Sequence, residues 1–163
     1  VEDIKAAVAT IKEHYGKIDM PLVVIGKPTK YLNKIIEYIE RHSLINIIFC
    51  DIVLNQDLPG IYQLADLFVY PSIFEGFGIP ILEALYSKVP VITSRASSMT
   101  EVGGEHTMYV DPTNVEEMAA AIKKVLFDDS LQEKMIIEGF RHARNFDGEK
   151  VAGNVMQVYQ KVI

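Results

Sequence analysis

Five short apolar runs alternate with longer amphipathic segments, and this alternation constrains the fold more than any other feature of the chain. The runs are rich in β-branched residues and predict strands over residues 22–26, 46–50, 67–72, 89–94 and 107–110. Runs of this kind are typical of strands that are buried on both faces of a parallel sheet. The sequence therefore predicts an α/β fold, with a doubly wound parallel sheet and helices on both of its faces.

The segments between these runs carry apolar residues at spacings of three and four, as amphipathic helices do. Helices are expected over residues 4–11, 32–39, 58–64, 115–127, 130–144 and 149–163, and a further helix is expected to begin at Pro80. Asn114 with Glu117, and Ser130 with Glu133, have the spacing of capping boxes at helix starts. The glycines at 103–104 are expected to lie in a loop.

Length, charge and cysteine content narrow the classes of function. A chain of 163 residues fits one domain. Its net charge of −6 disfavours a nucleic-acid partner, which normally requires a basic surface. The apolar runs have the length of strands, well short of the ~18 residues of a membrane span, so no transmembrane segment is expected. The single cysteine, Cys50, has no disulfide partner within the chain, and a reducing, cytoplasmic setting is expected.

The turn after the third predicted strand holds the densest group of candidate binding residues. In a doubly wound sheet, ligands bind beyond the carboxyl ends of the strands. Gly76 and Gly78 bracket Phe77 directly before a helix, where free N–H groups can bind a phosphate or sugar hydroxyls. Glu75 and Glu83 can flank one ligand, from the loop and from the helix. Alternatively, the glycines only supply positive φ for a tight turn, and Glu83 only favours the helix dipole.

The same two glycines are also compatible with a second class of ligand, a dinucleotide. Gly76 and Gly78 begin a G-x-G-x-x-G pattern, but Ile81 occupies the position of the third glycine, which close packing of helix and strand would require. Arg95, after the next predicted strand, could contact a 2′-phosphate. An NADP-binding oxidoreductase module therefore stays an alternative.

No pattern in the chain indicates a metal site or a catalytic nucleophile. Four histidines are far apart in the sequence and form no H-E-x-x-H or other short metal spacing, namely His14, His42, His106 and His142. Cys50 lies in an apolar run and is expected to be an inert core residue. Ser72 does not lie in a G-x-S-x-G motif, so a nucleophile elbow is not supported.

Residues 70–84, with the sequence YPSIFEGFGIPILEA, closely resemble the E-x7-E signature of retaining GT-B glycosyltransferases of the group 1, or family 4, type. Weaker matches to that family follow in the right order at residues 88–94, 101–104, 111–112 and 158–159. Together they cover residues 20–163. The resemblance implies an enzyme of two Rossmann-like halves with the active site between them, of which this chain is similar to the C-terminal, donor-binding half.

The resemblance also implies a role for each matching residue. Glu75 would lie beside the transferred sugar as the catalytic residue, and Glu83 would accept hydrogen bonds from the ribose hydroxyls. The backbone around Phe77 would bind the sugar hydroxyls and the distal phosphate. The segment around Ile52 and Val53 would line the base pocket. The donor-binding residues implied in this way are Gly26, Ile52, Val53, Gly76, Phe77, Gly78, Ile79 and Glu83.

The family uses a nucleotide-sugar donor, retains the anomeric configuration and usually needs neither a metal nor a cofactor. The resemblance therefore implies a hexosyltransferase of polysaccharide biosynthesis with a UDP- or GDP-linked donor. A sugar or a lipid-linked acceptor would bind through the N-terminal half, and the full-length enzyme would be cytoplasmic or peripheral to the membrane. A non-catalytic sugar-nucleotide-binding domain is the remaining alternative.

The sequence departs from the family pattern at three places. Cys50 stands where a glycine is common, and Gly148 stands where a tryptophan is often found. The family's first strand of this half, with an arginine and a lysine that clamp the diphosphate, would precede Val1. Residues 1–163 are therefore expected to form one nucleotide-sugar-binding domain, a fragment without the acceptor-binding half and without the first strand of its own sheet. Two facing strand edges would be unpaired, and the fragment would be inactive alone.

Overall fold

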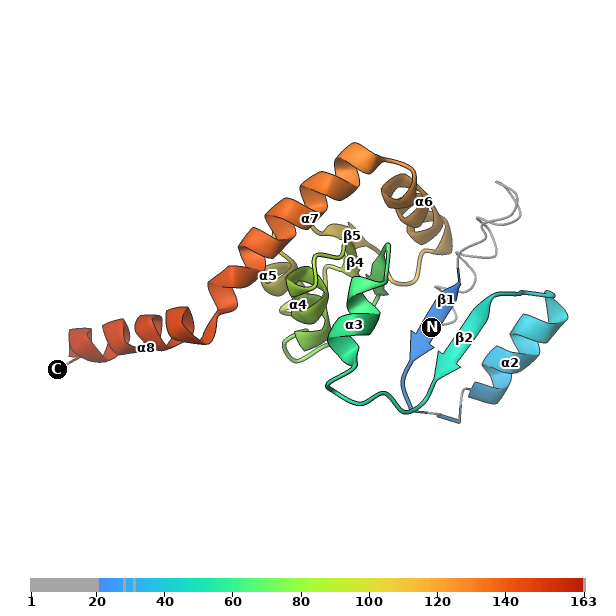
Figure 1. The fold of residues 1–163 in the computed structure, drawn as a ribbon, viewed down its shortest axis with the longest axis horizontal. Helices are drawn as coiled ribbons and strands as arrows, with labels where there is room; N and C mark the ends of the chain where they lie inside the picture. Colours follow the sequence, from blue (N-terminus) through green and yellow to red (C-terminus); the bar gives the residue numbers. More distant parts are fainter. Residues whose placement is uncertain (1–20, 28, 31, 163) are drawn as a thin grey trace.

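The structure, a computed structural model, describes residues 21–27, 29–30 and 32–162. Its five strands are all parallel and are surrounded by helices, so the α/β class predicted from the sequence is confirmed (Figure 1). The strands form two sheets rather than one, with orders β1-β2 and β3-β4-β5. The helix expected over residues 4–11 lies outside the described residues.

The smaller sheet comes first in the chain. Strand β1 (Leu22–Ile25) pairs with β2 (Ile47–Cys50), with Leu22 opposite Ile47. Helix α2 (Leu32–Arg41) connects the two strands and buries Ile35. Helix α3 (Leu58–Gln63) then leads to the larger sheet.

The larger sheet consists of β3 (Phe68–Tyr70), β4 (Val91–Ser94) and β5 (Met108–Val110). Helix α4 (Ile79–Tyr86) connects β3 to β4, and the short helix α5 (Met99–Gly103) connects β4 to β5. The sequence placed Gly103 in a loop, and this is wrong, because Gly103 ends α5 as a buried residue.

Both faces of the larger sheet are covered, as the apolar runs predict. Successive residues of a strand point to opposite faces. Val91 packs with Ile81 and Leu85 of α4, whereas Ile92 packs in a second cluster with Met118. That second cluster lies under α6 (Val115–Leu126) and α7 (Asp129–Ala143). Strand β4 is therefore the centre of the core, and all four of its residues are buried.

Described residues pair with only one edge of β1, through β2, and with only one edge of β3, through β4. The absent first strand remains a prediction, because the structure does not test where a longer sheet would begin. What the structure does show is that residues 22–50 pair among themselves and that residues 68–110 pair among themselves.

The helix starts confirm one predicted cap and correct another. Asn114 Oδ1 accepts a hydrogen bond of 3.0 Å from the Glu117 amide, as the capping box predicts. The Glu117 carboxylate, however, accepts from the Asp111 amide instead of completing the box. For α7 the predicted pair of Ser130 and Glu133 is wrong. Asp128 caps this helix, since its Oδ1 accepts from the Leu131 amide at 2.9 Å.

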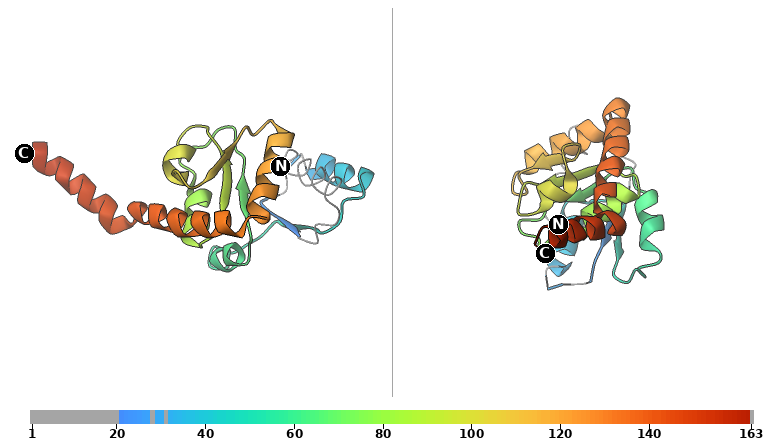
Figure 2. Two further views of the ribbon diagram at one scale, coloured as in Figure 1. Left: turned by 90° about the horizontal axis from the view of Figure 1, so that it is seen from above. Right: turned by 90° about the vertical axis from the view of Figure 1, so that its left-hand side faces the viewer.

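The chain ends in a short 3-10 turn, η1 (Arg144–Phe146), and a last helix, α8 (Gly148–Val162). Helix α8 extends away from the rest of the molecule (Figures 1 and 2). Residues 148–161 are all exposed, including the apolar stripe of Val151, Val155 and Val158. No helix within the described residues is long and apolar enough to cross a membrane.

Candidate functional site

The turn between β3 and α4 contains two glycines that differ in what they do. Gly78 is the N-cap residue of α4 and has a φ of 96°, a conformation that residues with a Cβ rarely adopt. Gly76 is not among the glycines with positive φ, and a Cβ placed on it would meet no atom within 4 Å. The backbone conformation of the turn therefore accounts for a glycine at position 78. The space beside Gly76, by contrast, is not filled by any described part of the chain.

The start of α4 presents unpaired backbone amides. The amides of Ile81 and Leu82 both donate to the Gly78 carbonyl, at 3.0 and 3.3 Å. No hydrogen bond within the described part of the chain engages the amides of Phe77, Gly78 or Ile79. Such amides at a helix start, where the helix dipole is positive, can bind an anion or a hydroxyl.

Glu75 is held beside this turn by a tyrosine of the preceding strand. The Tyr70 hydroxyl donates a hydrogen bond of 2.6 Å to Glu75 Oε2, and the Gly76 amide donates to Oε1 at 3.2 Å. Burial raises the pKa of Tyr70 to about 12, with further contributions from the hydrogen bond to Glu75 and from its charge. The phenol therefore stays protonated and orients the carboxylate.

Glu83 has a matching partner. The Tyr62 hydroxyl of α3 donates to Glu83 Oε2 at 3.1 Å. The pKa of Tyr62 is raised well above its ordinary value, chiefly by burial and then by the charge of Glu83 and this hydrogen bond. The ring of Phe68 lies between the two phenols, 5.3 Å from the ring of Tyr62 and 5.9 Å from that of Tyr70. This row of aromatic rings holds both tyrosines, and with them both glutamates, in fixed orientations.

Apolar side chains around the turn are exposed to an unusual degree. Phe74 is 81% exposed and Ile73 72%, while Ile79 is 59% exposed. Phe77 packs at one edge on Phe146 of η1, with ring centroids 5.9 Å apart, and remains 42% exposed. Exposed apolar groups beside free amides are typical of a surface that binds a ligand or another part of a protein.

The remaining predicted residues lie on the other sheet. Gly26 follows β1 with a φ of 155°, its amide donates to the Cys50 carbonyl at 3.0 Å, and no atom lies within 4 Å of a Cβ placed on it. Ile52 and Val53 follow β2, and Ile52 is 82% exposed. The structure thus places Glu75 to Gly78 in the turn between β3 and α4, with Ile79 and Glu83 in α4 itself, and places Gly26, Ile52 and Val53 at the carboxyl ends of β1 and β2.

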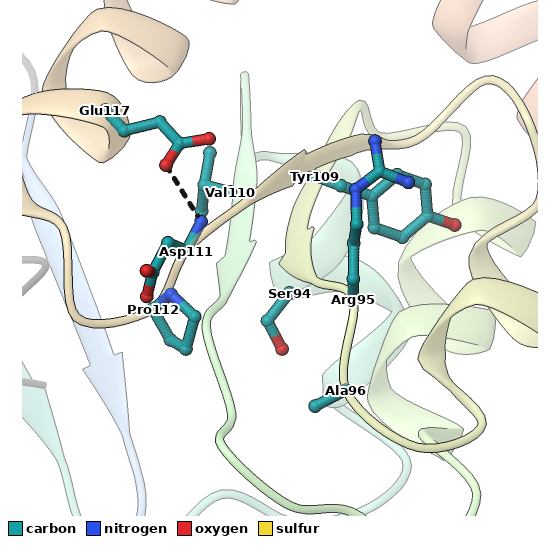
Figure 3. A pocket seen from close by; sticks show the side chains of 8 residues that line it. All are labelled: Ser94, Arg95, Ala96, Tyr109, Val110, Asp111, Pro112 and Glu117. Carbon is teal, nitrogen blue, oxygen red and sulfur yellow. Dashed lines mark hydrogen bonds between the residues drawn. The ribbon is translucent and has the colours of Figure 1, made fainter.

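A cavity of about 390 Å³ lies at the carboxyl ends of β4 and β5 (Figure 3). The guanidinium of Arg95 stands over the ring of Tyr109, 4.9 Å from its centroid, on one side of this cavity. Burial raises the pKa of Tyr109, and the charge of Arg95 opposes that shift. On the other side, Glu117 accepts from the Asp111 amide at 3.1 Å.

The dinucleotide pattern is not supported by the packing of α4. Ile81, at the position of the third glycine, is fully buried between α4 and the larger sheet. A helix that packs through such a side chain cannot approach its strand as a glycine allows. Arg95 contacts Tyr109 rather than the turn.

The described histidines and the cysteine stand apart. Within residues 21–27, 29–30 and 32–162, no three His, Cys, Asp or Glu side chains gather as a metal site would require. His42 contacts the Tyr38 carbonyl, and His142 the Glu101 carbonyl. Cys50 is free and half-buried rather than a core residue. The Ser72 hydroxyl donates to the Phe74 carbonyl at 2.8 Å.

Sequence reasoning missed three residues that touch the turn or its glutamates. They are Tyr62, Tyr70 and Ser98. Tyr70 directly precedes the proline that ends its strand, which was a signal available in the sequence. Tyr62 and Ser98 lie about twenty residues from their partners, as their separations of 21 and 22 residues show, so only the fold brings them together.

Comparisons with known proteins agree with this arrangement. The family model of the group 1 glycosyl transferases matches residues 1–142. The chain is 40% identical over 106 residues to the O-antigen chain mannosyltransferase B of Escherichia coli. The matched segment makes up 65% of this chain and 28% of that protein. It is 30% identical over 164 residues to the D-inositol 3-phosphate glycosyltransferase of Corynebacterium diphtheriae, with 97% of this chain and 38% of that protein covered. The chain thus spans about a third of the length of these relatives.

Solved structures give the same result for the fold. The C-terminal domain of a group 1 glycosyl transferase from Francisella tularensis matches with a TM-score of 0.78 and 25% identity, covering 89% of this chain and 77% of that domain. The Anabaena protein HepE, crystallised with UDP, matches with a TM-score of 0.86 and 18% identity, covering 98% of this chain and 44% of HepE. These matches do not favour an oxidoreductase. From the matched residues and the identities together, the chain belongs to the group 1 glycosyl transferase family.

Proposed function

We propose that this chain is the donor-binding half of a retaining GT-B glycosyltransferase, which transfers a hexose from a UDP- or GDP-linked donor to an acceptor. The observation that carries the proposal is the turn from Glu75 to Glu83. In the chain, the amides of Phe77, Gly78 and Ile79, which have no partner among the described residues, come between two carboxylates, each oriented by a half-buried phenol.

The turn has groups of the right chemistry for each part of a nucleotide sugar. Carboxylate oxygens accept hydrogen bonds from vicinal hydroxyls, so Glu83 binds the ribose and Glu75 lies beside the transferred sugar. The free amides bind the sugar hydroxyls and the distal phosphate, and the open space beside Gly76 admits them. Gly26 lets the donor approach the end of β1, and Ile52 and Val53 line the base pocket.

Catalysis in such a site depends on stabilising charge. The bond from the sugar to the diphosphate breaks, and the nucleoside diphosphate leaves with the electron pair. Amides at the start of α4 stabilise its developing negative charge. Glu75 orients the sugar and favours the positive charge that develops at its ring. The acceptor hydroxyl attacks on the face that the diphosphate leaves, which gives retention, and its proton passes to the departing phosphate oxygen. No metal is required.

The relatives support a hexose and a nucleoside diphosphate. Two of the matched proteins are named for transferring mannose to an O-antigen chain or a glycosyl group to inositol 3-phosphate. HepE was crystallised with UDP and also with UDP-glucose. By analogy, we propose a role in polysaccharide biosynthesis, in the cytoplasm or at the membrane surface. A sugar or lipid-linked acceptor would bind through an N-terminal half, so that residues 1–163 are inactive alone.

Ligand-observed NMR on the 163-residue chain tests this proposal. The ligands are UDP, GDP, their glucose and mannose conjugates, and NADP⁺, each at millimolar concentration. We expect one nucleoside diphosphate and its sugar conjugate to bind, and Glu83→Ala to abolish that binding. Glu133→Ala, which removes an exposed carboxylate on α7, is the matched control and should bind as the unaltered chain does.

Three outcomes contradict the proposal. The first is that the unaltered chain binds neither nucleoside diphosphate. Binding of NADP⁺ alone would indicate an oxidoreductase instead. Binding of a nucleoside diphosphate that Glu83→Ala leaves unchanged would place the ligand somewhere other than this turn.

A further inference from the structure

Three hydroxyl groups, two at the end of β4 and one at the start of α5, hold the backbone that leads into the glycine turn. Thr93 Oγ1 donates to the Tyr70 carbonyl at 2.7 Å, and the Ser94 hydroxyl donates to the Ser72 carbonyl. Ser98 Oγ lies 3.0 Å from the Gly76 carbonyl and 3.0 Å from the Phe77 carbonyl. We call Thr93, Ser94 and Ser98 the hydroxyl ladder. Its three members bind carbonyls at successive points along residues 70–77.

Ser98 is the member that reaches the turn itself. Its single hydroxyl proton is shared between two neighbouring carbonyls as a three-centre bond. Ser98 is also the N-cap residue of α5, a position from which serine usually caps its own helix. Within the described structure its hydroxyl makes no such cap and is committed to the turn instead.

The geometry of the peptide bond connects these carbonyls to the free amides. In a planar trans peptide, the C=O of one residue and the N–H of the next point in opposite directions. No cis peptide bond occurs among the described residues. The Gly76 carbonyl therefore points in the opposite direction to the Phe77 N–H. In the same way, the Phe77 carbonyl points in the opposite direction to the Gly78 N–H. When Ser98 holds both carbonyls on its own side, both amides point away from it.

We infer that Ser98 is a positioning residue, which sets the direction of the Phe77 and Gly78 amides toward the diphosphate of the donor. This inference rests on the proposed function for the identity of the ligand. Glycine peptides have wide conformational freedom, so the peptides on either side of Phe77 can rotate when nothing holds them. Ser98 removes that freedom before the ligand arrives, which lowers the entropic cost of binding.

The test compares Ser98→Ala with two further variants. Ser98→Thr keeps the hydroxyl. Ser97→Ala removes the neighbouring hydroxyl, which is exposed and has no hydrogen-bond partner among the described residues. For each variant, NMR measures the order of the backbone amides of residues 76–78. Titrations measure affinity for UDP and UMP, or for GDP and GMP, according to the base that the unaltered chain binds.

In Ser98→Ala we expect the amides of Phe77 and Gly78 to become mobile. The affinity for the diphosphate should fall about tenfold, the size expected for a lost hydrogen bond and its positioning effect. The monophosphate lacks the distal phosphate, so its affinity should not change. Ser98→Thr should restore both the order and the affinity, and Ser97→Ala should match the unaltered chain.

The outcomes separate this inference from the proposed function. If the unaltered chain binds neither diphosphate, the proposed function fails, and the amide measurement alone decides whether Ser98 positions the turn. If the diphosphate binds but Ser98→Ala leaves its affinity unchanged, the inference is overturned and the proposed function stands. An equal loss for diphosphate and monophosphate would also overturn it, because that pattern indicates general damage to the site.

Discussion

Tyr70 and Glu75 form a hydrogen bond of 2.6 Å between the last residue of β3 and the first carboxylate of the turn. Only a protonated phenol can donate this bond. The environment of Tyr70 keeps it protonated to a pKa of about 12, against an ordinary value of 10.0. This hydrogen bond therefore has two effects. It orients the proposed catalytic carboxylate, and it contributes to the pH dependence of the stability of the fold.

The free energy of unfolding should fall as the pH rises from 10.0 toward about 12. In this window the phenol of the unfolded chain has lost its proton while that of the folded chain has kept it. The folded state then binds more protons, and stability decreases with rising pH. Below the ordinary value the contribution of Tyr70 is constant. Urea unfolding at several pH values across the window measures the slope.

Tyr70→Phe should make that slope shallower, because it removes one of the phenols responsible. Glu75→Gln should reduce the contribution of Tyr70 only in part, because burial, the largest cause of the shift, remains. A slope that is the same in Tyr70→Phe and in the unaltered chain would contradict this assignment.

The two glycines of the turn should respond differently to the same substitution. Gly78→Ala forces a Cβ into a conformation with a φ of 96° and places it 3.3 Å from Ile81 Cδ1. A loss of about 1–2 kcal/mol in the free energy of unfolding is expected from the backbone conformation alone. Gly76→Ala meets no atom within 4 Å and should change stability by less than about 0.5 kcal/mol.

Substitution of Gly76 should affect donor binding, although it should have little effect on the stability of the fold. If the space beside it admits the donor, Gly76→Ala should weaken binding of the nucleoside diphosphate while the chain stays folded. Denaturant unfolding and ligand-observed NMR on the same samples separate the two effects. A stable Gly76→Ala variant with unchanged affinity would show that this space is not used by the ligand.

The cap of α7 gives a test that is independent of function. Asp128→Ala removes the acceptor of the Leu131 amide and should cost about 1 kcal/mol in the free energy of unfolding. Ser130→Ala, at the position where the sequence pattern suggested a cap, should cost less than about 0.5 kcal/mol. Urea unfolding of both variants decides between the two residues, and a larger loss in Ser130→Ala would favour the pattern over the structure.

Much of the fold could be predicted, because it depends on local patterns. Apolar runs predicted strands that are buried on both faces, and all four residues of β4 are buried, the polar Thr93 and Ser94 included. For β1 that prediction is wrong, because Val23 and Ile25 are exposed. The cap at Asn114 was visible for a similar reason, since both partners lie within one helical turn. Ser130 has the same spacing to a glutamate, but Asp128 begins the helix two residues earlier, and the pattern could not rank two acceptors so close together.

The site was predictable only where its residues are neighbours in sequence. Glu75 to Glu83 formed a recognisable turn, and the structure confirms the turn and the helix that follows it. Ser98 and Tyr62 were not predictable, because their bonds depend on where β4 and α3 pack. The division of the strands between two sheets agrees with the two unpaired strand edges that the family resemblance led us to expect. The alternation of strands and helices does not by itself specify which strands pair.

Helix α8 has a thermodynamic consequence of its own. Its residues 148–161 are exposed, so its helicity is set by intrinsic propensity and temperature rather than by burial. Isolated helices shorter than ~12–15 residues are marginal in water, and α8 has 15 residues with Gly153 in its interior. Heating should therefore unwind α8 gradually, and circular dichroism should show a sloping loss of helix before the cooperative step. Gly153→Ala should flatten that slope and leave the midpoint of the cooperative step unchanged, because this helix and the core unfold independently.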